Sequence, residues 1–121
     1  MKQLVIFVTT LDMENVAAIA DVFDGAKAAS DDYHVEIILT GESGIIATVQ
    51  AAENGLDVKL MCSIYESMRS AKSSGVKINI CERSIEWCNL NNNGLIPEID
   101  GIVSSQYIME RSTPDTYVVY L

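Results

Sequence analysis

The sequence predicts one α/β domain, residues 1–121, in which helices cover both faces of a mainly parallel sheet. Apolar, strand-like runs alternate along the chain with segments whose apolar residues recur at helical spacing, which is the element order of a parallel sheet with helical crossovers. The run from Leu4 to Val8 is continuously apolar, as in a strand buried on both faces. A length of 121 residues, with 49% apolar and 21% charged residues, is typical of a single globular domain.

A helix is expected after the first strand. Thr9 and Thr10 supply side chains that can cap it. The apolar residues that would face the sheet recur at helical spacing and are Val16, Ile19, Ala20, Phe23 and Ala26. A second apolar strand is expected over 35–39, and it ends at Thr40.

Two helices and a strand are expected in the middle of the chain. Ser43 can cap a short helix over 44–53. Ser63 and Glu66 have the spacing of a capping box, so a longer helix should begin at Ser63. The strand over 76–80 alternates apolar and polar residues, which predicts that one of its faces is less buried.

Three shorter elements and a last strand complete the expected fold. A short helix covers 82–90, and a short strand follows at 102–103. Ser104 can cap a helix that runs through Met109, and the chain ends in a strand over 118–121. The sheet therefore has five expected strands.

The charge balance excludes several classes of function. The chain has 8 Lys and Arg against 17 Asp and Glu, a net charge of −9, and no cluster of basic residues. Such a surface repels phosphate backbones and anionic lipids, so no nucleic acid and no membrane is expected as a partner. No apolar run approaches the roughly 20 residues that span a bilayer, and acidic residues follow the first run where a signal peptide would be cleaved. We therefore expect a cytoplasmic protein.

The three cysteines are Cys62, Cys81 and Cys88. Their number is odd and no secretory signal precedes them, so a disulfide framework is not expected. Their spacing and the single histidine do not supply the ligands of a structural zinc site, so no metal is expected. Cys88 is expected to be buried beside Trp87. Cys62 is either a second thiol near the same edge of the sheet or a residue without a chemical role.

Polar and nucleophilic side chains follow three of the expected strands. Sites of open parallel sheets gather at the carboxyl ends of the strands, so these residues are candidates for function. The candidates at this edge are Thr9, Thr10, Thr40, Gly41, Ser43 and Cys81.

Cys81 is the sharpest of these candidates because it directly follows a strand and directly precedes an expected helix. Backbone N–H groups and the helix dipole lower the pKa of a thiol at a helix start and favour the reactive thiolate. Arg83 would support the thiolate, and Glu82 would oppose it. The alternative is that Cys81 packs as a small buried hydrophobe.

Other chemistries lack the residues that they need. The residue six positions after Cys81 is Trp87, where a phosphatase or rhodanese loop has arginine. The segment from Gly41 to Gly44 lacks the lysine of a P-loop, and Glu42 gives it the wrong charge for a phosphate. The segment after the first strand has no glycine and carries acidic residues, which disfavours a flavin. We expect no cofactor.

The strand that ends at Cys81 also carries a family resemblance. The segment from Gly75 to Cys81, followed by a short helix and then Gly94-Leu-Ile-Pro97, resembles the DsrE/DsrF-like (DsrEFH) family of small sulfur-relay proteins. The resemblance implies a three-layer α/β/α domain with a mainly parallel five-stranded sheet, assembled into homo-oligomers, trimers or hexamers. It also implies that Cys81 accepts sulfur as a persulfide from a protein donor and passes it to a protein acceptor.

Three functional hypotheses follow. The first is a sulfur carrier that uses Cys81, with Arg83 in a supporting role and possible sulfurtransferase-type thiol chemistry. The second is a non-catalytic oligomeric binding module of the same fold, in which Cys81 is buried and transfers no sulfur. The third is a thiol redox sensor that pairs Cys81 with a neighbouring subunit.

Overall fold

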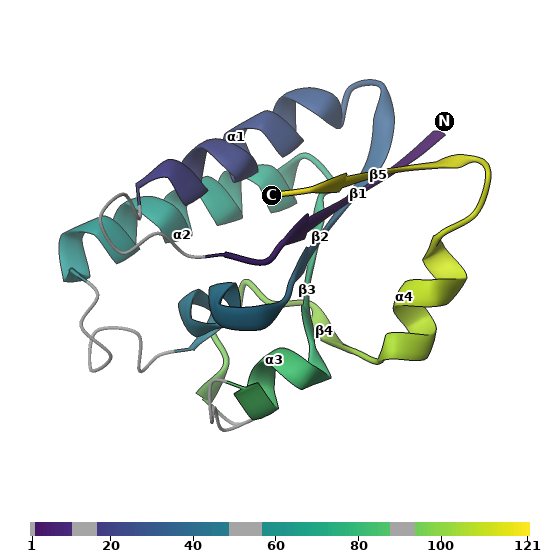
Figure 1. Cartoon of the computed structure of the whole chain (residues 1–121). Helices are drawn as coiled ribbons and strands as arrows, with labels where there is room; N and C mark the ends of the chain where they lie inside the picture. The colour runs from purple at the N-terminus through teal and green to yellow at the C-terminus, as the bar shows by residue number, and fades with distance from the viewer. Residues whose placement is uncertain (1, 11–16, 49–56, 88–93) are drawn as a thin grey trace.

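Five parallel strands form the centre of the fold (Figure 1). A computed structural model describes residues 2–10, 17–48, 57–87 and 94–121. The strands lie in the order β4-β3-β2-β1-β5, and each neighbouring pair is parallel. Their bounds are β1 Lys2–Val8, β2 Tyr33–Leu39, β3 Lys77–Cys81, β4 Gly101–Val103 and β5 Thr116–Tyr120. The predicted α/β class with a five-stranded parallel sheet is confirmed.

Strands β1 and β2 are largely apolar in their second halves because they lie inside the sheet with neighbours on both sides. Residues Val5 to Val8 and Val35 to Leu39 are all buried. A strand covered on both faces needs apolar side chains at odd and even positions alike. Glu36 is the single charged residue in these two buried runs.

Helices α1 (Ala18–Ala29) and α2 (Val58–Ser73) lie side by side on one face of the sheet (Figure 1). The predicted stripe of α1 is confirmed at Ile19, Phe23 and Ala26, which are buried; Val16 lies outside the described residues. These side chains pack with residues of β1, β2, β3 and α2 in the larger of two apolar clusters.

Helix α2 begins five residues earlier than the capping box predicts. The Asp57 side chain is the cap, and its Oδ1 accepts a hydrogen bond of 3.0 Å from the Leu60 backbone N–H. Ser63 and Glu66 are exposed residues inside the helix, so the predicted start at Ser63 is wrong. The pattern that defines a capping box also arises on the outer face of a longer helix. Gly75, at φ +95°, follows its carboxyl end.

The segment after β2 is a 3₁₀ helix, η1 (Gly41–Ala47), which is shorter and begins earlier than the helix expected over 44–53. Ser43 is buried inside η1 and does not cap it, and residues 49–53 lie outside the described residues. Helix α3 (Glu82–Trp87) packs closely against η1. A Cβ atom at Gly44 would lie 2.0 Å from the Ser84 Oγ, so glycine permits this approach.

Helix α4 (Ser105–Arg111) covers the other face of the sheet. The Ser104 hydroxyl caps it by accepting from the Tyr107 N–H at 3.1 Å, as predicted, and the helix runs two residues past Met109. The expectation of a less buried face on β3 is wrong, because Ile78 to Cys81 are all buried. None of the helices in the described ranges is long and apolar enough to span a bilayer.

Candidate functional site

Cys81 is the last residue of β3, and α3 begins at the next residue. Its side chain is only 5% exposed. It belongs to the smaller apolar cluster, together with Val5, Phe7, Ile38 and Val103. Tyr107 and Ile108 of α4 pack against this cluster from outside. The thiol is therefore at the expected end of the sheet, beneath α4.

The charged residues that follow Cys81 in the sequence lie on the surface. Glu82 and Arg83 are both exposed on the first turn of α3. Within the described part of the chain, no hydrogen bond or ion pair joins Arg83 to Cys81. A supporting role of Arg83 stays a prediction.

The threonines and Ser43 at this edge hold the backbone together. The Val8 carbonyl accepts from the Thr40 backbone N–H at 2.9 Å, from the Thr40 hydroxyl at 3.3 Å and from the Ser43 hydroxyl. The Leu121 carbonyl accepts from the Thr9 hydroxyl at 3.0 Å and from its backbone N–H at 2.9 Å. These side chains therefore fasten the ends of β1 and β2 and the carboxyl terminus.

The close approach of η1 to the end of β1 requires glycine at position 41. Gly41 has φ +55°, and a Cβ atom there would lie 2.9 Å from the Thr9 carbonyl oxygen. Its own carbonyl accepts a 2.5 Å hydrogen bond from the Ser84 hydroxyl of α3. The structure thus brings Thr9, Gly41 and Ser84 together; Thr10 is exposed next to them in sequence.

Cys81 and η1 are on opposite faces of the sheet. Ile80 and Ile46 of η1 belong to the larger cluster, whereas Cys81 belongs to the smaller one. Successive residues of a strand point to opposite faces, so the Cys81 thiol turns away from η1. The predicted edge residues therefore divide into a polar group around η1 and a thiol beneath α4.

The remaining cysteines are placed differently. Cys62 is exposed on α2. Cys88 lies outside the described residues, and Trp87, beside which it was expected to be buried, is itself 78% exposed. Within the ranges that the structure describes, no group of three or more His, Cys, Asp or Glu side chains could hold a metal ion.

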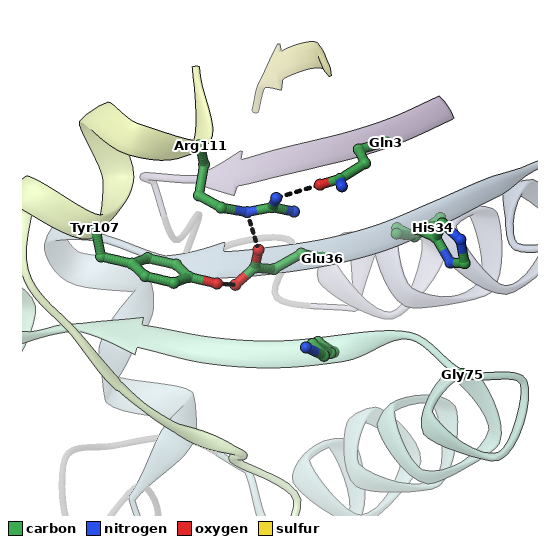
Figure 2. A pocket seen from close by; sticks show the side chains of 8 residues that line it. Gln3, His34, Glu36, Gly75, Tyr107 and Arg111 are labelled. Atoms are coloured by element: carbon green, nitrogen blue, oxygen red, sulfur yellow. Dashed lines mark hydrogen bonds and ion pairs between the residues drawn. The ribbon is translucent and has the colours of Figure 1, made fainter. Parts of the chain in front are cut away.

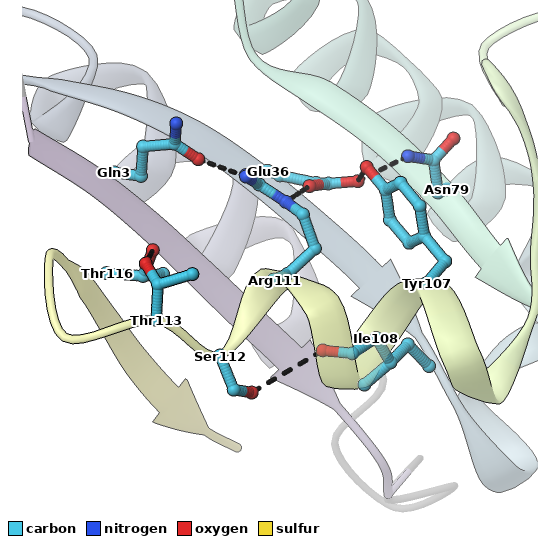
Figure 3. Close-up of polar contacts among 9 residues, drawn as sticks. All are labelled: Gln3, Glu36, Asn79, Tyr107, Ile108, Arg111, Ser112, Thr113 and Thr116. Carbon is cyan, nitrogen blue, oxygen red and sulfur yellow. Dashed lines mark hydrogen bonds and ion pairs between the residues drawn. The ribbon is translucent and has the colours of Figure 1, made fainter.

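A buried polar cluster around Glu36 escaped the sequence reasoning (Figure 3). Glu36 is 1% exposed, and its Oε1 accepts from the Arg111 Nε at 2.8 Å. Its Oε2 accepts from the Tyr107 hydroxyl at 2.7 Å and from the Asn79 Nδ2 at 2.6 Å. The Arg111 Nη1 also donates to the Gln3 Oε1. The cluster ties α4 to three strands.

Burial and the Glu36 carboxylate together raise the pKa of Tyr107 above its usual value, and the phenol donates its proton to the hydrogen bond with the Glu36 Oε2. One signal in the sequence could have revealed this cluster. Glu36 interrupts an apolar strand, and Asn79 interrupts the next one. A charge on a strand that is covered on both faces requires buried partners.

Comparison with known proteins shows a shared fold. No sequence model of a protein family matches the chain, and neither does any functionally curated protein. Among solved structures, the protein of unknown function MTH1491 from Methanobacterium thermoautotrophicum superposes with a TM-score of 0.70 at 14% identity, over 100% of both chains. The ychN protein from E. coli gives 0.68 at 12% identity, again over 100% of both chains.

A third similar structure is the conserved protein of unknown function BT1422 from Bacteroides thetaiotaomicron. It gives a TM-score of 0.62 at 18% identity, over 99% of this chain and 95% of that one. Since all three identities are below 20%, the likeness concerns the fold. The chain thus has the α/β architecture of a group of small proteins found in bacteria and an archaeon.

Proposed function

We propose that the chain is a sulfur carrier of the DsrE/DsrF-like kind, acting as a single domain with Cys81 as its sulfur acceptor. The observation that carries the proposal is the position of the thiol. Cys81 ends a strand at the carboxyl edge of a parallel sheet, where sites of such folds gather, and it directly precedes a helix. The family resemblance of the segment around Cys81 supports the same role.

The proposed step needs no cofactor. The Cys81 thiolate attacks the outer sulfur of a donor persulfide, R–S–SH. A new S–S bond forms on Cys81, the S–S bond of the donor breaks, and the donor leaves as the thiolate R–S⁻. The sulfane sulfur changes carrier without net oxidation, and an acceptor thiolate removes it by the same exchange.

The burial of Cys81 sets a condition for this chemistry. The proposed approach to the thiol is from the α4 side, because α4 contributes Tyr107 and Ile108, two of the three partly buried apolar residues that pack against its cluster. Helix α4 has seven residues, none of which is buried, so little apolar area holds it in place. Segments with few buried apolar contacts open at a lower free energy than the core, although opening of α4 must also break its hydrogen bonds to Glu36. Opening of α4 is therefore the proposed route of the donor to Cys81.

The test uses a chain in which Cys81 is the only cysteine, Cys62→Ser/Cys88→Ser, because the exposed Cys62 would otherwise react as well. The matched control also carries Cys81→Ser. After incubation with a small-molecule persulfide, the first protein should gain about 32 Da per sulfur in its intact mass, reversibly on reduction. The control should gain nothing. A folded Cys81-only chain that gains no sulfur would overturn the proposal.

A second candidate, the oligomeric binding module without sulfur transfer, is favoured by the same burial of Cys81 and by exposed apolar residues. Apart from Val58 on α2, the large exposed apolar residues of the described ranges lie on α3, β4, α4, β5 and the carboxyl terminus, and are Trp87, Ile102, Met109, Tyr117, Val119, Tyr120 and Leu121. A binding module would show a Cys81 thiol that is inert in the folded protein. The mass experiment therefore separates the two candidates.

A further inference from the structure

A cavity lies at the amino ends of the strands, at the end of the sheet opposite Cys81 (Figure 2). It has a volume of about 370 Å³ and is lined by β1, β2, β3 and α4. The polar side chains that line it are Gln3, His34, Glu36, Lys77, Tyr107 and Arg111. The volume falls in the range of small-molecule pockets, about 300–1,000 Å³.

The acceptor groups of this cavity are already used by the protein. Both oxygens of Glu36 accept hydrogen bonds, from Arg111 on one side and from Tyr107 and Asn79 on the other. The side-chain oxygen of Gln3 accepts from Arg111. A ligand that enters the cavity therefore meets carboxylate and amide oxygens that each already accept at least one hydrogen bond from the protein.

Donor groups, in contrast, remain available. The Arg111 guanidinium uses its Nε and Nη1 for Glu36 and Gln3, which leaves Nη2. Lys77 and His34 are exposed at the starts of their strands, and neither makes a side-chain hydrogen bond to the described residues. Asp100, which lies outside the cavity lining, interacts electrostatically with Lys77. Its carboxylate accepts hydrogen bonds from Lys72 and from the Ile78 N–H.

The local charge differs in sign from that of the whole chain. The lining has two positive side chains, Lys77 and Arg111, and one negative side chain, Glu36. Its net charge is therefore +1 when His34 is neutral, whereas the whole chain carries −9. Because the buried Glu36 fixes the Arg111 guanidinium in one orientation, its remaining N–H groups are positioned before any ligand arrives. A fixed guanidinium and an ammonium in the lining of one cavity suit an oxyanion.

We propose that this cavity binds a small oxyanion, the carboxylate or phosphate group of a small metabolite, through Arg111 and Lys77. His34 adds an imidazole donor at the same wall. The site is separate from Cys81 and does not depend on sulfur transfer.

The test is calorimetric titration with citrate and with inorganic phosphate at constant ionic strength, with sodium chloride as the blank. Lys77→Gln removes one cavity cation, and Lys59→Gln makes the same charge change on the exposed surface of α2, outside the cavity. We expect saturable binding of at least one of the two anions that weakens by about fivefold or more in Lys77→Gln and by less than about twofold in Lys59→Gln.

The two probes also identify the ligand class. Binding of citrate alone points to carboxylates, and binding of phosphate alone points to phosphorylated compounds. The thermal midpoint of each free variant, which should equal that of the unmodified chain, shows that the fold is intact. The absence of saturable binding of either anion, or an equal loss in both variants, would overturn the proposal.

Discussion

Glu36 carries a negative charge into the middle of the sheet. Desolvation of a lone carboxylate there would be costly, and three donors, Asn79 of β3 and Tyr107 and Arg111 of α4, offset that cost. The cluster includes Arg111 at the end of α4, so a helix that buries little apolar surface gains a polar anchor. The position of α4 over Cys81 thus depends on a residue 45 positions before the cysteine in the sequence.

Replacing Glu36 by Gln should strongly destabilise the protein, because Arg111 would lose its counter-ion in a largely buried place. We expect the free energy of unfolding to fall by about 2–4 kcal/mol in denaturant titrations. Glu66→Gln, the same change at an exposed position of α2, should shift it by less than about 0.5 kcal/mol. Equal effects of the two substitutions would contradict the account of the cluster.

Asp100 gives a pH-dependent contribution to stability. Burial raises the pKa of its carboxyl, but the 2.5 Å bond from Lys72 and the 2.8 Å bond from the Ile78 N–H outweigh burial, so the pKa is lowered from 3.8. A lowered folded-state pKa stabilises the protein above the unfolded-state value, and this stabilisation is lost as the pH falls through the folded-state value.

Asp100→Asn should therefore lower the free energy of unfolding by about 1 kcal/mol at neutral pH, a modest value because the side chain is partly exposed. The difference from the unmodified chain should stay constant down to about pH 5 and shrink below about pH 4. Denaturant titrations at several pH values measure it. A difference that grows on acidification has the wrong sign for this account.

Single residues were predictable from the sequence only where local context decides them. The place of Cys81 at a strand end follows from its neighbours in the chain. The partners of Glu36 do not, because Asn79 and Arg111 reach it only through the strand order and the docking of α4. The same holds for the burial of Cys81, which depends on α4 and β4.

At the scale of elements, helix α2 has two candidate N-terminal caps in the sequence, Ser63 and Asp57. Ser63 and Glu66 fit a capping motif, but Asp57 makes the capping hydrogen bond. Asp57→Ala should lower the free energy of unfolding by about 1 kcal/mol, whereas Ser63→Ala should change it by less than about 0.5 kcal/mol. Denaturant titration of both variants measures the two losses in free energy of unfolding. A larger loss in Ser63→Ala than in Asp57→Ala would contradict the observed helix start.

The types of the elements were better predicted than their ends. Apolar runs and helical spacing identified the strands and α1, because burial on one or two faces leaves a periodic pattern. The helix after β2 is instead a 3₁₀ helix over Gly41–Ala47. Its extent depends on the close contact of Gly44 with Ser84, which lies 40 positions later in the chain.

At the scale of the whole molecule, the two faces of the sheet are covered unequally. Two long helices cover one face, and the seven-residue α4 covers part of the other. Exposed apolar side chains gather around α4 and the edge strand β5, among them Met109, Tyr117 and Val119. Exposed apolar surface on an unpaired edge strand is a surface on which chains associate.

We therefore expect the protein to self-associate through the α4 and β5 side. Light scattering during size-exclusion chromatography should give a mass above the 13.2 kDa of one chain, and the trimer or hexamer that the DsrE/DsrF-like resemblance implies would give roughly 40 or 79 kDa. Met109→Glu/Val119→Lys should shift the mass toward that of a single chain, whereas Glu66→Lys on α2 should leave it unchanged. A monomer of the unmodified protein would contradict this expectation.

The overall architecture could be predicted because it depends on the order of elements and on which strands are buried on both faces. The unequal coverage of the two faces of the sheet could not be predicted, since it follows from the length of α4 and from the Glu36 cluster. The proposed sulfur-carrier role depends on this coverage, because in that proposal α4 opens before a donor reaches Cys81.

The most direct test is the alkylation rate of Cys81 in the folded Cys62→Ser/Cys88→Ser chain, measured by intact mass and compared with the rate that global unfolding allows. Cys81 should react much faster than global unfolding permits, because local opening of α4 would expose the thiol. If Cys81 reacts only at the rate set by global unfolding, the thiol is a permanent part of the core, and the sulfur-carrier function is contradicted.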